Sequence, residues 1–140
     1  MIFLVNDVAL AVQQTKAFEK FLGEYKNIDI SGQTENAPPI LKLLNNGYQI
    51  IVLTAQLLVN AMKPRTLEFK GVSDQIHFDH FSLMVIDECH HADRGHPYNV
   101  LMAKYVDMKL ANSTMRLPQV IHFPHYMVLS SFISILHSLV

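Results

Sequence analysis

The sequence predicts an α/β fold in which a parallel sheet carries helices on both faces. Short apolar runs alternate along the chain with segments of helical periodicity, which is typical of βαβ units. Two of the runs, Ile2–Val5 and Leu83–Ile86, are apolar at every position. Continuous apolar runs are expected for parallel strands that are buried on both faces.

The first half of the chain predicts three strand–helix pairs. Helices follow from apolar spacing at three and four residues, and the third strand follows from a β-branched apolar run. Asn6 or Asp7 can cap the first helix and Gly23 can end it, while Asn45–Gly47 closes the second helix and Pro64 stops the third. The expected order is strand Ile2–Val5, helix Val8–Leu22, strand Tyr25–Ile30, helix Ile40–Leu44, strand Tyr48–Thr54 and helix Ala55–Met62.

The second half begins with a polar stretch, residues 63–80, in which one helical turn is expected near Asp74–Phe78. The strand Leu83–Ile86 follows, and a helix is expected from about Tyr98 to Lys109 after a loop. A last strand, Leu117–Ile121, can pair beside the strand Leu83–Ile86. Pro124 prevents it from continuing as a central strand.

Composition limits the class of protein. The 140 residues suit one domain, and with 50% hydrophobic and 16% charged residues the chain is globular. The net charge of −1 gives no overall basic field, so any contact with nucleic acid must come from a local surface. The single cysteine, Cys89, excludes an internal disulfide and fits a reducing compartment.

No membrane segment is expected. The start of the chain is too short and too polar for a signal peptide. The apolar run Tyr126–Val140 is shorter than the ~20 residues that span a bilayer, and four serines and a histidine interrupt it.

Two adjacent acids, Asp87 and Glu88, directly follow the strand Leu83–Ile86. Ligands of open α/β sheets bind at the carboxyl ends of the strands, where these acids are expected. Successive strand residues point to opposite faces, so the two acids have different roles. One can hold a hard cation such as Mg2+, and the other can orient or deprotonate a water. A bare acid pair more often only ends a strand, so the rest of the chain decides between these interpretations.

Asp87-Glu88-Cys89-His90 behind a hydrophobic strand resembles motif II, the Walker B box, of DECH-type superfamily 2 helicases. Further blocks stand in the order seen in RIG-I-like receptor helicases, the DECH-box RNA sensors related to the Dicer helicase. These blocks are Phe3–Asn6 with Gln13-Gln14, Ile30–Thr34, Val52–Asn60, His96–Asn99 and Leu117–Ile121. The resemblance covers roughly residues 1–121. It implies part of the first RecA-like domain, a sheet of the P-loop NTPase type.

In that family, ATP and Mg2+ lie between two RecA-like domains and drive movement on double-stranded RNA, in a cytoplasmic antiviral RNA sensor. The resemblance implies that Asp87 binds Mg2+ through water, Glu88 positions the attacking water, and His90 links the nucleotide to the RNA-contacting parts. It also implies an RNA face whose amides and hydroxyls hold phosphates without reading bases. That face would contain Asn6, Gln14, Ser31, Gly32, Thr54, Gln56 and Arg94.

The chain departs from the family in several places. It contains no Gly-x-x-x-x-Gly-Lys-Ser/Thr loop (Walker A) and no second RecA-like domain. After Ile121 it reads His122–Tyr126, where the family has the Gly-Leu-Thr-Ala-Ser of motif III. We therefore expect residues 1–121 to form a partial helicase ATP-binding domain and residues 122–140 to form a divergent apolar tail. The remaining helicase domains would be partners.

Alternatives stay open. The chain can be a fragment of an RNA-dependent ATPase, a non-catalytic RecA-like half that only binds RNA or a partner, or part of a DNA-acting superfamily 2 helicase. We expect the 140 residues alone to be inactive toward ATP. Thr54 can be only a helix cap, and Gln14 can be only a solvated residue. Zinc binding by Cys89, His90, His91 and His96 is disfavoured, because neighbouring strand side chains diverge and no second cysteine exists.

Overall fold

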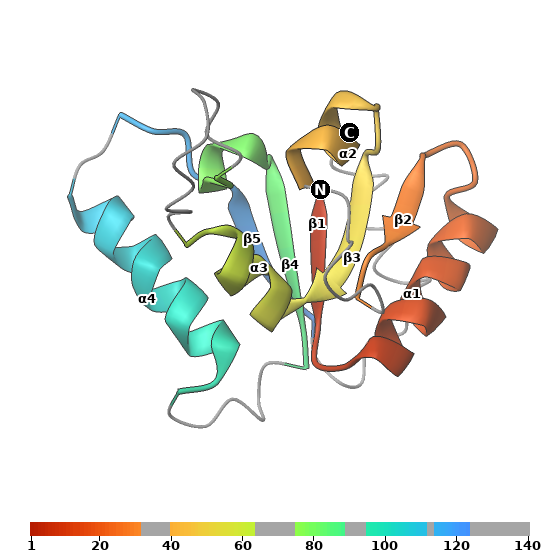
Figure 1. Cartoon of the computed structure of the whole chain (residues 1–140), viewed down its shortest axis with the longest axis horizontal. Helices are drawn as coiled ribbons and strands as arrows, with labels where there is room; N and C mark the ends of the chain where they lie inside the picture. The colour runs from red at the N-terminus through yellow and green to blue at the C-terminus, as the bar shows by residue number, and fades with distance from the viewer. Residues whose placement is uncertain (32–39, 64–74, 89–94, 112–113, 124–140) are drawn as a thin grey trace, which may run out of the picture.

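The computed structural model of the chain describes residues 1–31, 40–63, 75–88, 95–111 and 114–123. Five strands in these ranges form one parallel sheet in the order β2-β3-β1-β4-β5 (Figure 1). The predicted α/β fold is confirmed. The elements are β1 (Ile2–Val5), α1 (Val8–Phe21), β2 (Asn27–Asp29), α2 (Ile40–Asn45), β3 (Ile50–Thr54), α3 (Ala55–Ala61), the 3-10 turn η1 (Phe78–His80), β4 (Leu83–Asp87), α4 (Pro97–Leu110) and β5 (Gln119–Phe123).

The first strand of the chain lies at the centre of the sheet. β1 pairs with β3 and β4, so that Leu4 lies beside both Leu53 and Ile86. β5 pairs with β4, as predicted from its position after motif II. It extends to Phe123, and the expected boundary between residues 121 and 122 therefore falls inside a strand. His122 and Phe123 remain compatible with an extended backbone up to Pro124.

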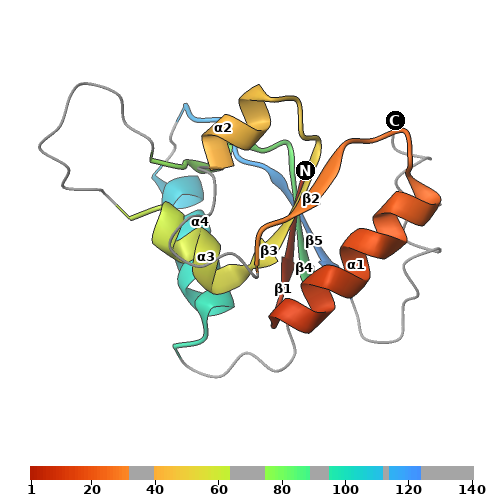
Figure 2. The ribbon, with the colours of Figure 1, turned by 45° about the vertical axis from the view of Figure 1, so that its right-hand side comes forward.

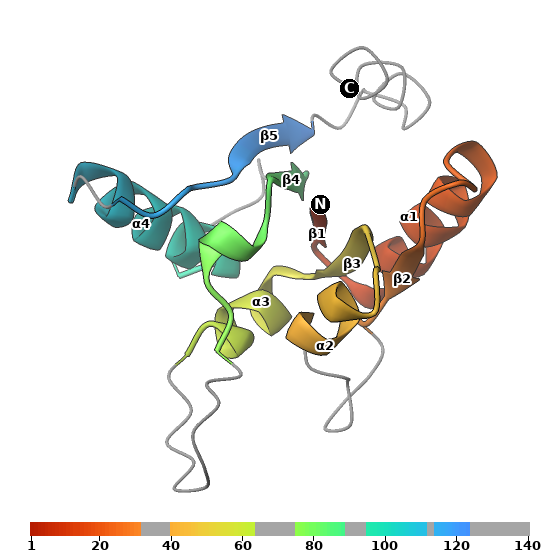
Figure 3. The ribbon, with the colours of Figure 1, turned by 90° about the horizontal axis from the view of Figure 1, so that it is seen from above.

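Helices cover the two faces of the sheet unequally. Figure 2 shows the strands nearly edge-on, with α1 on one side and α2, α3 and α4 on the other, and Figure 3 shows the same division from above. Alternate residues of each strand serve the two sides, as the pleat requires. On β1, Ile2 and Leu4 face the three-helix side, whereas Phe3 and Val5 face α1.

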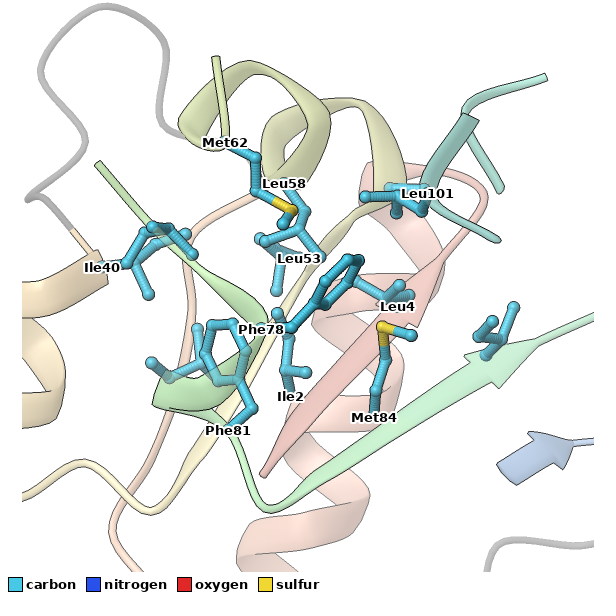
Figure 4. Packing of buried hydrophobic residues seen from close by; sticks show 14 of the residues in the cluster. Ile2, Leu4, Ile40, Leu53, Leu58, Met62, Phe78, Phe81, Met84 and Leu101 are labelled. Carbon is cyan, nitrogen blue, oxygen red and sulfur yellow. The ribbon is translucent and has the colours of Figure 1, made fainter. Parts of the chain in front are cut away.

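The larger apolar cluster lies on the three-helix side. Leu4, Leu53 and Met84 from the sheet pack with Leu58 of α3 and Leu101 of α4, and the aromatic rings of Phe78 and Phe81 complete this layer (Figure 4). The smaller cluster under α1 contains an edge-to-face pair, Phe3 and Phe18, with ring centroids 5.2 Å apart. Both faces of the central strands are therefore buried, which explains why their sequences do not alternate.

Several boundaries differ from the predictions. α1 ends at Phe21 with Leu22 as its cap, and Gly23 does not adopt a left-handed conformation. A side chain at Gly23 would instead place Cβ 3.1 Å from the Glu19 carbonyl oxygen, so close approach explains this glycine. Gly47 does have a positive φ of 79°, as expected for the end of α2.

Two predicted segments are displaced or shortened. β2 covers Asn27–Asp29 rather than Tyr25–Ile30, because only these three residues are in register with β3. Ile30 still donates a hydrogen bond to Val52 O. The turn expected near Asp74–Phe78 is a 3-10 turn at Phe78–His80, and Asp74 lies outside the described residues. Among the described helices, none is long and apolar enough to cross a membrane.

Candidate functional site

The carboxyl ends of the parallel strands meet along one edge of the sheet, at the bottom of Figure 1. Asp87 ends β4, with Glu88 directly after it, and Asn6 follows the neighbouring β1. Thr54 ends β3, where it lies beside Val5 of β1. The structure therefore places the acid pair at the carboxyl edge, as expected, together with Asn6 and Thr54 of the implied RNA face.

The carboxylate of Asp87 points toward α1. Val85 packs under α1, and Asp87 shares its side of the strand because alternate residues face the same way. Gln14 follows the inward residue Ala11 of α1 by three positions and precedes the inward Phe18 by four, so it lies on the same helical stripe. Its Nε2 donates a hydrogen bond of 3.3 Å to Asp87 Oδ2. Asp87 is only 4% exposed, so this amide fixes the orientation of a buried carboxylate.

Glu88 leaves the strand in a left-handed conformation, with φ of 48°. Apart from glycine, residues adopt this conformation at a cost of about 1–2 kcal/mol. Its backbone carbonyl accepts a hydrogen bond of 3.5 Å from Asn6 Nδ2. Glu88 lies beyond the last residue of β4, so the alternation of a strand does not apply to it, and the division of roles between the two acids stays a prediction.

Asn6 also carries an unsatisfied acceptor. Its Oδ1 is buried and has no hydrogen-bond partner, while its Nδ2 contacts Glu88 O. Ser31, beyond the end of β2, has a buried Oγ in the same condition, and its backbone N–H donates to Asp29 Oδ1 at 2.7 Å. Buried polar atoms without partners are uncommon in folded proteins. Both atoms lie beyond strand ends on the carboxyl edge, where Asn6 Oδ1 can accept a hydrogen bond from a ligand and Ser31 Oγ can accept or donate one.

Tyr98 of α4 reaches the same edge from the opposite face of the sheet. Its hydroxyl lies 2.9 Å from Asp87 O and 3.3 Å from Leu4 O, and the residue is 2% exposed. His96 caps the helix, with Nδ1 accepting a 3.3 Å hydrogen bond from the Tyr98 backbone N–H. The sequence indicated Tyr98 only as a helix start. Its place in the block His96–Asn99 was the available signal, and the structure adds that the residue is buried, so its hydroxyl needs a partner.

Among the described residues, neither Thr54 nor Gln56 forms a hydrogen bond with Asp87 or Glu88. Thr54 is the N-cap residue of α3 but its side chain makes no capping hydrogen bond. Gln56 is exposed on α3, and its Nε2 donates to Asn60 Oδ1 at 3.0 Å. Gly32, His90 and Arg94 lie outside the described residues, so their predicted roles stay predictions.

The donor set fits one half of an ATP–Mg2+ site. Mg2+ is commonly bound by one or two carboxylates, waters and substrate phosphates, and Asp87 provides one oriented carboxylate. Within the described ranges no group of three or more His, Cys, Asp or Glu side chains could hold a metal without a substrate. The loop that cradles the phosphates in P-loop proteins, Gly-x-x-x-x-Gly-Lys-Ser/Thr, is not contained in this sequence, so these residues would hold only the Mg2+ side of such a site.

Comparison with known proteins gives a consistent result. A family model described as type III restriction enzyme, res subunit, matches residues 1–117. The antiviral innate immune response receptor RIG-I of Homo sapiens is 37% identical over 123 residues, which cover 86% of this chain and 12% of that protein. The ATP-dependent RNA helicase DHX58 of Mus musculus is 27% identical over 121 residues, covering 86% of this chain and 17% of that protein.

A plant protein matches at lower identity over a similar length. Endoribonuclease Dicer homolog 2 of Arabidopsis thaliana is 25% identical over 126 residues, covering 85% of this chain and 8% of that protein. The chain thus spans less than a fifth of the length of each of these relatives.

Proposed function

The chain belongs to the helicase family described as type III restriction enzyme, res subunit, and we propose that it contributes the motif II half of an ATP-dependent helicase site. In this proposal it corresponds to part of the first RecA-like domain of RIG-I-like receptors, which it resembles. The proposed enzyme is a translocase on double-stranded RNA that acts as a cytoplasmic antiviral RNA sensor. The proposed cofactors are ATP and Mg2+. Partners are double-stranded RNA and the other helicase domains.

One observation carries the proposal. The carboxylate of Asp87 is buried, oriented by Gln14 at 3.3 Å, and located at the carboxyl edge of the parallel sheet. Gln14 holds this buried carboxylate in a defined orientation at the end of β4. Ligand binding at this edge is the general rule for open α/β sheets, and a water-mediated Mg2+ contact suits a single carboxylate.

The two acids would divide the chemistry of hydrolysis. Mg2+, when bound with ATP, would neutralise charge on the phosphates. Asp87 would hold that ion through water, with Gln14 keeping Oδ2 in place. Glu88 would orient the attacking water and accept its proton, which requires a carboxylate close to the reacting phosphate. The left-handed backbone at Glu88 sets the direction in which its side chain leaves the strand.

RNA binding is proposed on the adjoining part of the edge. Asn6 and Ser31 have buried polar atoms without partners there, and Thr54 begins α3 without using its hydroxyl as a cap. Such groups can hold phosphate oxygens without reading bases. With a net charge of −1, this chain would bind nucleic acid weakly on its own. The DNA-acting alternative shares this chemistry, so only a comparison of the two polymers separates them.

A chimera tests the proposal. Residues 1–121 replace the matching segment of human RIG-I, and ATP hydrolysis is measured with double-stranded RNA, double-stranded DNA or no polymer. We expect hydrolysis that RNA stimulates and DNA does not, and loss of that hydrolysis on Asp87→Asn. Equal stimulation by DNA would favour the DNA-acting alternative. A folded chimera that binds RNA without hydrolysis would support the non-catalytic alternative.

The isolated chain provides the complementary measurement. Without the phosphate loop, the 140 residues lack the amides and lysine that provide most ground-state binding of phosphates. We expect ATP hydrolysis no faster than in buffer. RNA-stimulated turnover that Glu88→Gln abolishes would refute this expectation.

A further inference from the structure

We propose that Tyr98 is a positioning residue for Glu88, and that its hydroxyl holds the backbone of motif II in the conformation needed for hydrolysis. The inference rests on the proposed function of Glu88. It adds a residue from α4, on the face of the sheet opposite α1, to those that define the site.

The hydroxyl of Tyr98 occupies the point where two strands separate. The pairing of β1 with β4 ends at Leu4 and Ile86. At the end of this pairing, the carbonyl oxygens of Leu4 and Asp87 both lie within hydrogen-bonding distance of Tyr98 Oη, at 3.3 and 2.9 Å. A single hydroxyl proton is thus shared between the ends of β1 and β4, so the phenol ties together the strands that carry Asn6 and Glu88.

Both peptide groups around the Glu88 Cα are anchored by these contacts. The carbonyl before it, Asp87 O, accepts from Tyr98, and the carbonyl after it, Glu88 O, accepts from Asn6 Nδ2 at 3.5 Å. The left-handed conformation at Glu88, with φ of 48°, is unfavourable for a residue with a side chain. Such a conformation persists only where its surroundings determine it. These two anchors contribute to that determination.

The tyrosine is itself held rigidly. Its ring is 2% exposed and contacts the ring of His96, with centroids 4.8 Å apart. Pro97 and the His96 cap fix the start of α4, so the phenol approaches the sheet from a defined direction. A phenylalanine at position 98 would keep the ring packing and remove only the hydroxyl.

Tyr105 offers a matched control on the same helix. Its hydroxyl donates a 2.9 Å hydrogen bond to a backbone carbonyl, Pro118 O, ahead of β5. Tyr98→Phe and Tyr105→Phe therefore delete the same chemical group from α4, and only the first deletion touches motif II. In the RIG-I chimera, we expect Tyr98→Phe to lower kcat roughly 10-fold with little change in the KM for ATP, because misplacement of a catalytic group weakens the transition state more than substrate binding. Tyr105→Phe should leave kcat within about twofold.

A second measurement uses the 140-residue chain and needs no activity. The Cα and Cβ chemical shifts of Glu88, read by NMR, report its backbone conformation. We expect them to move toward extended values in Tyr98→Phe and to stay fixed in Tyr105→Phe. Unchanged Glu88 shifts, or equal kcat values for the two variants, would show that Tyr98 only stabilises the fold. Loss of hydrolysis on Tyr98→Phe with normal hydrolysis on Glu88→Gln would instead contradict the proposed function of Glu88.

Discussion

The left-handed backbone of Glu88 predicts that glycine at this position is more stabilising than alanine, the reverse of the usual order in helices. At φ of 48°, a residue with a Cβ carries a cost of about 1–2 kcal/mol that glycine avoids. Glycine also favours the unfolded chain, because its greater conformational entropy there lowers the unfolding free energy by about 0.4–1 kcal/mol relative to alanine. Glu88→Gly should therefore be more stable than Glu88→Ala by about 1 kcal/mol. The comparison with alanine removes the contribution of the glutamate side chain, which is lost in both variants.

Glu19 provides the control, because it is an exposed residue inside α1. In a helix interior, glycine is less favourable than alanine by about 1 kcal/mol. The order of stability should thus be reversed, with Glu19→Ala above Glu19→Gly. Replacing alanine by glycine therefore raises stability at one position and lowers it at the other.

Thermal unfolding of the four variants measures both orders. For a domain of this size, 1 kcal/mol corresponds to about 4 °C in Tm. We expect Tm to rise by about that amount from Ala to Gly at position 88 and to fall by about that amount at position 19. If alanine is as stable as glycine at position 88 while the Glu19 pair behaves as expected, Glu88 is not left-handed and the argument about its position fails.

Three further predictions concern the fold around the site. Phe18→Ala should destabilise the chain by about 3–5 kcal/mol, because Phe18 is fully buried against Phe3. Val12→Ala, at an exposed position of α1, should change the unfolding free energy by less than about 0.5 kcal/mol. Comparable losses for the two variants in urea denaturation would contradict this packing. A chain that ends at Phe123 should have a higher melting temperature than one that ends at Ile121, because it keeps the strand pairs Ile86–His122 and Asp87–Phe123. Equal melting temperatures would mean that the last two residues of β5 do not contribute to stability. Burial lowers the pKa of the Met1 amine in the folded chain below 8.0, the value for an unfolded chain, so the unfolded chain binds more protons between these two pKa values. The unfolding free energy should therefore rise with pH across that interval, up to about 8. An N-terminally acetylated chain should not show this rise.

Much of the fold was predictable because the sequence carries strong local signals. The buried strands Ile2–Val5 and Leu83–Ile86 are continuous apolar runs, and their parallel pairing follows from the helices between strands. The edge that gathers Asn6, Thr54 and the acid pair was predictable for the same reason, since all parallel strands end there. The DECH box supplied the family.

The contacts that orient the site were not predictable in the same way. Gln14 reaches Asp87 only because it lies on the inward stripe of α1 over that strand, and the sequence left it as either an RNA contact or a solvated residue. The positive φ of Glu88 is accompanied by long-range contacts from Asn6 and Tyr98, which no local pattern of the sequence specifies. The length of β5 depends on pairing with β4, which a pattern in five residues cannot specify.

The most direct test of the account is Glu88→Gln in the RIG-I chimera, measured under single-turnover conditions with RNA present. The substitution keeps the size of the side chain and removes the carboxylate that would orient and deprotonate the water. We expect ATP binding to remain and hydrolysis to fall by about 100-fold or more, the range typical for loss of general-base catalysis. Near-normal hydrolysis in this variant would contradict the claim that the acid pair at the carboxyl edge is the hydrolytic site.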